Sequence, residues 1–219
     1  MKTVIFSQIS IDGKITLGAG NSSKGLFDMF STDDMRYIHN FRGSMDGIMV
    51  GRKTVEADNP FLTNRFEQNR NPVRIVPTNT MDIALDANIF KDGEKTIIVT
   101  TENCANNEKV EAIRKLHKNC IVCGKDTVDF KKLFQQLESI YSIHSIMVEG
   151  GGRLNWSLIN EELVDEIVLM QLPVIIGGAN NISLVDGDGY TQLPELKRYE
   201  LREVQPEHNY TLLRYTRMY

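Results

Sequence analysis

The sequence predicts an α/β protein in which a largely parallel sheet ends in a C-terminal antiparallel hairpin. Apolar, β-branched runs alternate with segments of helical periodicity, an order typical of parallel strands covered by helices. One segment has apolar residues at i, i+3, i+4 and i+7, which places them on one buried helix face. These residues are Phe130, Leu133, Phe134 and Leu137. Near the C-terminus, residues 199–204 and 210–215 alternate apolar and polar side chains, which predicts the hairpin.

The bulk composition is that of a globular protein. With 219 residues, 41% of them hydrophobic and 25% charged, the chain is long enough for one well-packed domain, and we expect a single domain over residues 1–219. The formal net charge of -4 gives no basic field for nucleic acid. No apolar run reaches the length of a membrane span, and no signal-peptide core follows Met1. We therefore expect a cytoplasmic protein that binds neither nucleic acid nor membrane.

The first elements follow from local signals. Residues 3–10 form an apolar, β-branched run that stops at the turn signal Asp12-Gly13. Residues 18–25 are rich in glycine and hydroxyl side chains, which predicts a polar loop suited to ligand contacts or simply a surface loop. Ser31 is a helix N-cap, so a helix should span about 32–43. A short strand is then expected over 46–50.

The remaining elements continue the same alternation. A third strand over 71–77 is bounded by prolines, and a fourth is expected over 95–101. Further strands are expected at 121–122, 145–148 and 166–172. Between them lie predicted helices, the first with Val110, Ile113 and Leu116 on one face and the last running through Leu158 and Ile159.

Three cysteines are too few, and odd in number, for a disulfide framework. Cys120 and Cys123 have the spacing of half a zinc site, and Cys104 is a conceivable third ligand. The residues between the pair are apolar, however, and no second pair follows, so we interpret these cysteines as buried or edge thiols and predict no metal site.

The turn at residues 149–152 is the strongest functional signal. Glu149 ends a predicted strand and is followed by Gly150, Gly151 and Gly152, after which a helix begins. Glycines at a helix N-terminus let a phosphate approach the backbone N–H groups, and ligands of open α/β sheets bind at the carboxyl ends of strands. The alternative is a tight connection in which Glu149 only orders the turn.

A second strand also ends in glycine, at Gly51. Thr54 and Asp58 follow it four residues apart, on one face of a short helical turn. Farther along, Arg65 and Arg70 lie between this turn and the next strand, and one of them could hold a phosphate.

Taken together, these stretches resemble the pyrimidine reductases of riboflavin biosynthesis, whose fold is that of dihydrofolate reductase. The resemblance runs essentially end to end and rests on several motifs in order. They are 10–14 (SIDGK), 46–51 (DGIMVG) with Thr54 and Val55, 57–60 (ADNP), 71–76 (NPVRIV), 148–152 (VEGGG) with 154–156 (LNW), and 163–166 (LVDE). The fold implied is a three-layer α/β/α arrangement around a mostly parallel, mixed sheet.

The resemblance implies reduction of the ribosyl group of a ribosylamino-pyrimidine 5′-phosphate to ribityl, with NADPH as the cofactor and NADH as an alternative. The zinc deaminase domain of the bifunctional bacterial enzymes has no counterpart here, since neither H-x-E nor P-C-x-x-C occurs. The implied substrate is therefore the 2,5-diamino-6-ribosylamino-pyrimidinone phosphate. A homodimer is also implied.

The family's site residues carry over by motif. Substrate contacts are implied for Ser22, Arg42, Leu62, Arg65 and Glu149. Cofactor contacts are implied for Thr54, Asp58, Thr100, Gly150, Gly151, Gly152, Arg153 and Leu154. Arg52 and Lys53 are candidates for a 2′-phosphate by position only.

Our hypothesis is that Glu149 is catalytic, by hydrogen bonding to the substrate or by managing protons, and that Arg65 and Arg42 hold the 5′-phosphate. Three alternatives remain. The chain could reduce the already deaminated 5-amino-6-(5-phosphoribosylamino)uracil, act as a dihydrofolate reductase with a changed pocket, or be a non-catalytic nucleotide-binding module.

Overall fold

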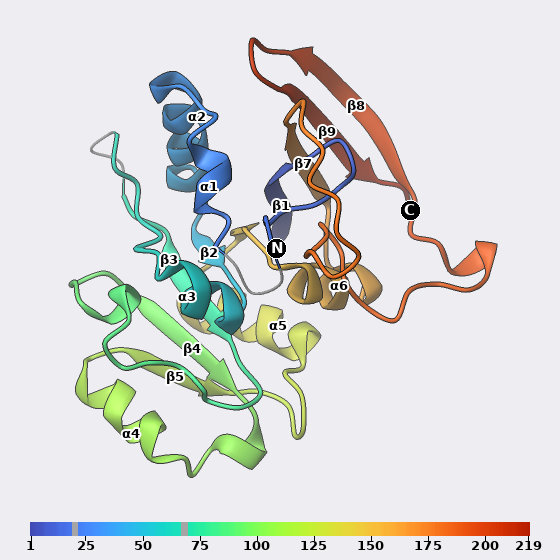
Figure 1. Ribbon diagram of the computed structural model, residues 1–219. Coiled ribbons are helices and arrows are strands. Elements are labelled where there is room, and N and C mark those ends of the chain that lie inside the picture. The colour runs from blue at the N-terminus through green and yellow to red at the C-terminus, as the bar shows by residue number, and fades with distance from the viewer. Residues whose placement is uncertain (19–21, 67–69) are drawn as a thin grey trace.

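A computed structural model describes residues 1–18, 22–66 and 70–219 (Figure 1). Within these residues, nine strands form one sheet in the order β5-β4-β3-β2-β6-β1-β7-β9-β8. The strands are β1 (Lys2–Ile9), β2 (Gly47–Met49), β3 (Val73–Pro77), β4 (Thr96–Thr100), β5 (Asn119–Val122), β6 (Ser145–Val148), β7 (Glu166–Gln171), β8 (Tyr199–Pro206) and β9 (Thr211–Arg217). Strands β1 to β7 pair in parallel, and β9 runs antiparallel to both β7 and β8. The predicted mixed sheet is therefore confirmed.

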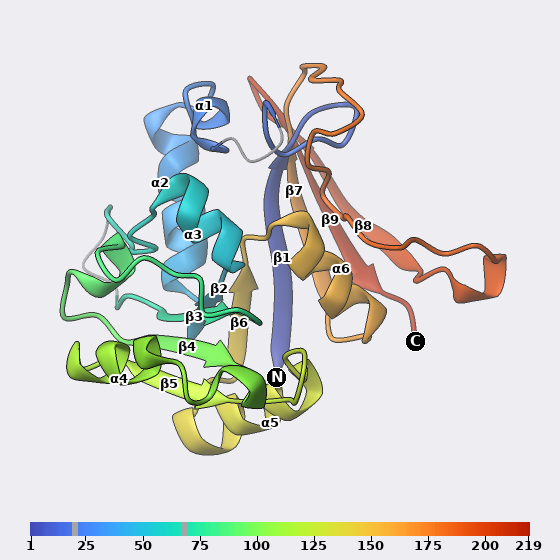
Figure 2. The ribbon, with the colours of Figure 1, turned by 60° about the horizontal axis from the view of Figure 1, so that its bottom comes forward.

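The chain order differs from the order in the sheet at one important place. Strand β6 lies between β2 and β1, with Val148 paired to Met49 on one side and to Ile5 on the other. The carboxyl ends of these three strands, far apart in the sequence, consequently meet at one edge (Figure 2).

The helices are α1 (Lys24–Phe27), α2 (Thr32–Gly43), α3 (Arg52–Asp58), α4 (Glu108–Lys115), α5 (Phe130–Tyr141) and α6 (Gly152–Asn160). In the part of the chain that the structure describes, three short 3-10 turns occupy Asn88–Phe90, Glu102–Cys104 and Leu193–Glu195. Helix α2 begins where predicted, because Ser31 and Asp34 form a capping box at its N-terminus. The polar loop expected over 18–25 ends earlier than predicted, since Lys24 already starts α1, and residues 19–21 of that loop lie outside the described residues.

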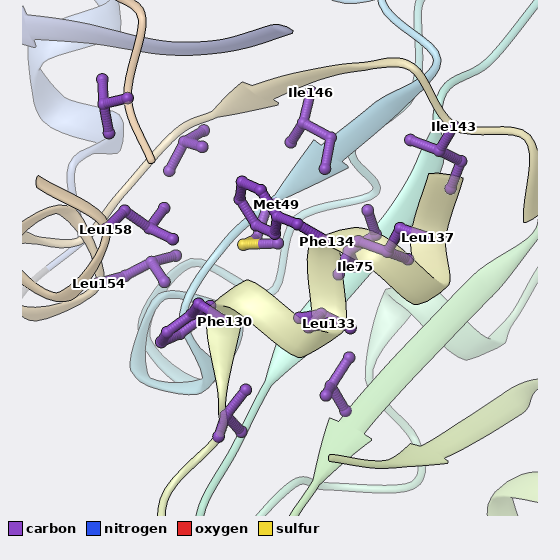
Figure 3. Packing of buried hydrophobic residues seen from close by; sticks show 14 of the residues in the cluster. Met49, Ile75, Phe130, Leu133, Phe134, Leu137, Ile143, Ile146, Leu154 and Leu158 are labelled. Atoms are coloured by element: carbon purple, nitrogen blue, oxygen red, sulfur yellow. The ribbon is translucent and has the colours of Figure 1, made fainter. Parts of the chain in front are cut away.

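Helices cover both faces of the sheet and make the three predicted layers. On one face, α5 and α6 pack against the residues of β2, β3 and β6 that point toward them (Figure 3). Leu133 and Leu137 of α5 have no exposed surface, and burial of a side chain of this size contributes roughly 1.5–3 kcal/mol. On the other face, α2 packs on β1, β6 and β7, while α3 and α4 together share a core cluster with β2, β3 and β4.

The cysteines are free thiols, and the described residues show neither a metal-binding cluster nor a membrane-spanning helix. Cys123 is buried, while Cys104 and Cys120 are half-buried free thiols. In the described ranges, no three His, Cys, Asp or Glu side chains come together in a way that could hold a metal ion. None of the helices described is both long enough and apolar enough to cross a membrane.

Candidate active site

The candidate active site lies at the carboxyl ends of β2 and β6, which are neighbours in the sheet. The N–H of Glu149 donates to the carbonyl of Met49 at 3.0 Å, and the N–H of Gly51 donates to the carbonyl of Gly150 at 2.8 Å. The two strands therefore continue into a pair of glycine turns that lie against each other. Open α/β sheets bind their ligands at this edge.

Each glycine turn leads into a helix that has no side-chain cap. Gly51 precedes α3 and Gly151 precedes α6, and neither offers a side chain to the first N–H groups of its helix. Thr54 of α3 faces the second turn, because a Cβ placed on Gly151 would lie 3.7 Å from its Oγ1. The N-terminus of α6 is thus suited to an anion, with the Thr54 hydroxyl beside it.

The glycines of the second turn are required for different reasons. Gly150 has a φ of 86°, a conformation that favours glycine, and its peptide bond to Gly151 is cis. Gly152 is buried, and a Cβ there would come within 2.6 Å of both the Ser183 carbonyl oxygen and Oδ2 of Asp186. The lack of a side chain at Gly152 therefore lets the segment around Ser183 pack on α6, a requirement that the sequence motif did not reveal.

Glu149 is held by an arginine from a distant helix. Arg42, near the end of α2, donates from Nε and Nη2 to Oε1 of Glu149 at 3.0 and 2.8 Å, and from Nη2 to Oε2 at 3.1 Å. Its Nη1 donates to the carbonyl of Thr63 at 2.8 Å. The two charged side chains are only 9% and 18% exposed, so this charge-assisted pair is largely enclosed.

The segment that follows Pro60 lies beside this pair. Leu62 has a φ of 56° and is buried in the core cluster that α4 covers. Arg65 is exposed, and its backbone N–H donates to Nδ1 of His39 in α2 at 3.2 Å. The structure thus brings Leu62, Arg65, Arg42 and Glu149 into one region, where Arg65 is exposed and Arg42 is only 9% exposed.

His39 is a neighbour of the candidate site that the sequence did not indicate. It is buried under the segment that carries Arg65. Burial, reinforced by the charges of Arg42 and Arg65, lowers the pKa of His39 to about 4. At neutral pH the ring is therefore uncharged, and the bond from the Arg65 N–H assigns its Nδ1 as an acceptor.

Asp58 is the last residue of α3, and Ser22 lies just before the start of α1. The Asp58 carboxylate accepts from the N–H of Ser23 at 3.1 Å and from its hydroxyl at 2.9 Å. The Ser22 hydroxyl accepts from the N–H of Lys24 at 3.0 Å. Both predicted site residues therefore already hold the start of α1, and Asp58 attaches that start to α3.

The other predicted cofactor residues are less accessible. Leu154 is buried in the core cluster of α5 and α6, so only its backbone faces the turn, whereas Arg153 is exposed. Thr100 ends β4 with no exposed surface, and its hydroxyl has no hydrogen-bond partner among the described residues. Arg70 pairs with Asp46 at the start of β2, which is the opposite end of that strand from Glu149.

Residues 2–210 match the model of the RibD C-terminal domain family. The chain belongs to this family. The 2,5-diamino-6-ribosylamino-4(3H)-pyrimidinone 5′-phosphate reductase of Aquifex aeolicus (strain VF5) is 44% identical over 199 residues, which cover 91% of this chain and 88% of that protein. The name of this relative agrees with the predicted oxidoreductase of riboflavin biosynthesis.

Solved structures support the fold. A pyrimidine reductase-like protein from Corynebacterium diphtheriae superposes with a TM-score of 0.81 at 18% identity and covers 100% of this chain and 92% of that one. A dihydrofolate reductase from Enterococcus faecalis superposes with a TM-score of 0.54 at 11% identity, covering 99% of this chain and 96% of that one. The dihydrofolate reductase-like fold predicted for this RibD-family chain is confirmed.

In this RibD-family chain, the motif at residues 10–14 contributes to the family resemblance but has no predicted role. The structure places it against residues 176–183. The Asp12 carboxylate accepts from the N–H groups of Ile176 and Gly177, which, after the hydrogen bond of Ser10, help to lower the pKa of Asp12 to about 2. Lys14 donates to the carbonyl of Asn181 and the hydroxyl of Ser183, at 3.0 and 2.9 Å. The motif at 10–14 therefore fastens the segment that packs on Gly152.

A hollow of about 410 Å³ lies along α3, away from Glu149. Arg52 and Lys109 contribute cations to its wall, and Arg52 donates to Glu56 at 2.8 Å. The other lining residues are Val55, Asn59, Asp82, Ile83, Ala84, Asp86 and Ala87. Arg52, one of the two residues considered for a 2′-phosphate, thus borders an open space, whereas Lys53 is simply exposed.

Proposed function

We propose that this chain reduces the ribosyl group of 2,5-diamino-6-ribosylamino-4(3H)-pyrimidinone 5′-phosphate to ribityl, using NADPH. The observation that carries the proposal is the placement of Glu149, a carboxylate fixed beside the uncapped N-terminus of α6 at the ligand-binding edge of the sheet. The name of the Aquifex relative supports the choice of substrate.

The residues present fit a nicotinamide dinucleotide. The N–H groups at the start of α6 and the hydroxyl of Thr54 suit its diphosphate, since nothing from a side chain caps that helix. The buried hydroxyl of Thr100 lacks a partner among the described residues. Thr100 ends β4, which is separated from β2 by one strand, β3, along the same edge of the sheet. Asp58 would contribute by keeping the start of α1 against α3.

When bound, the cofactor supplies a hydride to C1′ of the substrate. The ribose must first open: the bond from C1′ to the ring oxygen breaks, the amino nitrogen forms a C=N bond to C1′, and the proton of that nitrogen passes to the ring oxygen. After hydride addition the nitrogen takes up one proton from water. Glu149 would orient the substrate by accepting hydrogen bonds, and exposed Arg65 would hold the 5′-phosphate.

One assay tests this function. The diaminopyrimidine substrate and its deaminated counterpart, 5-amino-6-(5-phosphoribosylamino)uracil, are each mixed with the protein and NADPH, and then with NADH. We expect turnover to be fastest with the diaminopyrimidine and NADPH. Preference for the uracil would move the enzyme to the later step. Reduction of dihydrofolate would replace the proposal, and cofactor binding without any turnover would indicate a binding module.

Preference for NADPH over NADH is part of the proposal, and Arg52 is our candidate for the contact with the 2′-phosphate. It borders the hollow along α3 and is 19% exposed. Arg52→Gln should raise the KM for NADPH while leaving that for NADH unchanged. An equal effect on both cofactors would assign Arg52 to the Glu56 ion pair alone.

We also propose a single reductase domain over residues 1–219 that forms a cytoplasmic homodimer. The continuous sheet supports one domain, and the free thiols suit a reducing compartment. The edge strand β8 supports the dimer, because Leu201 and Val204 are 48% and 54% exposed on it. Sedimentation should give the mass of a dimer, and Val204→Lys should shift it to a monomer.

A further inference from the structure

Arg42 has too few open donors to serve mainly as a phosphate clamp. An arginine side chain carries five N–H donors on three nitrogens. All three nitrogens of Arg42 already donate, Nε and Nη2 to Glu149 and Nη1 to the carbonyl of Thr63. The side chain is 9% exposed. These four bonds leave one N–H, on Nη1, open to a ligand, which is too few for a two-point contact with a phosphate.

Glu149, in contrast, depends on Arg42 for its orientation. Among the described residues, every hydrogen bond that its carboxylate accepts comes from Arg42. Its backbone is fixed at the end of β6 by the bond to Met49, and the next residue is a glycine that offers no side chain to pack against. The direction of the carboxylate is thus set by a guanidinium that is itself fixed by the carbonyl of Thr63.

We propose that Arg42 is a positioning residue, which holds the Glu149 carboxylate as a hydrogen-bond acceptor facing the substrate and does not itself bind the 5′-phosphate. This inference rests on the proposed function. It leaves phosphate binding to Arg65, which is exposed and lies two residues after Thr63. It also makes Glu149 an acceptor that orients the substrate, since both of its carboxylate oxygens already accept from Arg42.

Lysine at position 42 separates the two roles. It keeps the positive charge but has one nitrogen in place of the three that fix Glu149, so it cannot reproduce the two-point contact. A shift of about 1 Å in a positioned group can cost up to about 100-fold in rate. We therefore expect Arg42→Lys to lower kcat about 10- to 100-fold while the KM for the pyrimidine phosphate changes by less than about threefold.

A double-mutant cycle with Glu149→Gln is the decisive experiment. If Arg42 acts through Glu149, Arg42→Lys should change kcat/KM by less than about threefold once Gln is present at position 149, because the carboxylate that it positions has gone. If the two effects multiply, Arg42 acts on the substrate directly and the proposal is wrong. Arg42→Gln with Glu149→Gln, which leaves no unpaired charge, repeats the cycle if Arg42→Lys does not fold.

Inhibition by ribose 5-phosphate provides a second readout that a purely structural role would not reproduce. Its Ki should rise at least tenfold in Arg65→Ala and stay within about threefold in Arg42→Lys. A comparable rise of Ki in both variants would show that Arg42 binds the phosphate, and the proposal would be wrong. If the wild type turns over neither pyrimidine, the proposed function fails, and the same cycle is then measured on pyrimidine phosphate binding by calorimetry.

Discussion

Two buried arginines, each paired with a partly exposed carboxylate, lie at different ends of the sheet strands and differ in what they can do. Arg74, at the start of β3, donates to both carboxylate oxygens of Asp92 at 2.7 and 2.6 Å and to the carbonyl of Ile89 at 3.1 Å. Arg42 likewise binds one carboxylate, that of Glu149, and one carbonyl. The bonding is similar, so the chemistry of the pair alone does not identify a site.

The surroundings account for the difference. Arg74 has no exposed surface and is enclosed by core residues, and the backbone carbonyl of Asp92 also accepts from the buried Lys118. Glu149 is 18% exposed and lies beside the two glycine turns at the carboxyl ends of β2 and β6. The two carboxylates are both partly exposed, at 30% for Asp92 and 18% for Glu149, so what separates them is position: Glu149 lies at the edge of the sheet where open α/β folds bind ligands, and Asp92 does not.

Removing Arg74 should have the largest effect on stability. Arg74→Ala leaves the Asp92 carboxylate and a buried carbonyl without their partner, which costs about 3–5 kcal/mol in the free energy of unfolding. Urea unfolding followed by Trp156 fluorescence measures it. Arg42→Ala is the matched variant, and we expect a cost at least about 1 kcal/mol smaller because Arg42 is 9% exposed, so water can enter beside it, whereas Arg74 is fully buried. Equal costs would show that the two surroundings do not differ.

His39, which lies beside the candidate active site, should make the free energy of unfolding depend on pH. Its pKa of about 4 in the folded state lies below the ordinary 6.5, so the unfolded chain binds a proton first as the pH falls. The contribution of neutral His39 to the free energy of unfolding is fully present above pH 6.5. It is lost as the pH falls from about 6.5 to about 4, by at most about 3 kcal/mol. Urea unfolding at several pH values measures the loss.

The control for that measurement is His39→Gln, which can still accept from the Arg65 N–H and does not titrate. Its stability should be flatter than that of the wild type between pH 6.5 and 4.5. Asp92, whose pKa is lowered chiefly by the hydrogen bond from Arg74, contributes at lower pH, as its carboxylate protonates below its ordinary 3.8. The same slope in both proteins would exclude His39 as the source.

Neutralising the two carboxylates should separate activity from stability. Glu149→Gln is expected to lower the rate of NADPH oxidation about 100-fold, which corresponds to about 2.7 kcal/mol, because a positioned carboxylate is lost. Asp92→Asn should leave the rate of the folded enzyme unchanged and lower the urea midpoint. An unchanged kcat in Glu149→Gln would show that Glu149 has no part in the mechanism. The Arg42–Glu149 and Arg74–Asp92 pairs would then not differ in function.

The smallest effect is expected at the exposed arginines. Arg65→Ala should raise the KM for the pyrimidine phosphate by about tenfold or more, since a charge-assisted contact is worth about 1.5–3 kcal/mol, and should leave kcat nearly unchanged. Arg70→Ala is the control, because Arg70 pairs with Asp46 at the far end of β2. A similar KM increase in both would point to a general electrostatic effect.

Local patterns predicted most of the fold. The Ser31 cap fixed the start of α2, and the spacing of Phe130, Leu133 and Leu137 identified the face of α5 that packs on the sheet. These signals involve neighbours in the sequence, so they need no knowledge of the tertiary structure. The turn at Glu149 was located for the same reason.

Contacts between distant residues could not be predicted in this way. Arg42 and Glu149 are 107 residues apart, and nothing local to Arg42 indicates that its guanidinium is already bonded. Gly152 looked like part of a phosphate cradle, yet its tightest neighbours are Ser183 and Asp186. The family resemblance supplied the site residues, and the tertiary structure divides them into groups open to a ligand and groups bound by the protein.

The insertion of β6 between β2 and β1 also has a consequence for how the chain reaches its native state. Lys2 pairs with Ser145, so the first strand of the protein finds this neighbour only after most of the chain has been synthesised. Pairings so distant in sequence slow folding, and they leave strand edges open to other chains in the meantime. The edge that carries the candidate site is therefore among the last parts to be assembled, and truncation before residue 145 would leave nascent chains prone to aggregation.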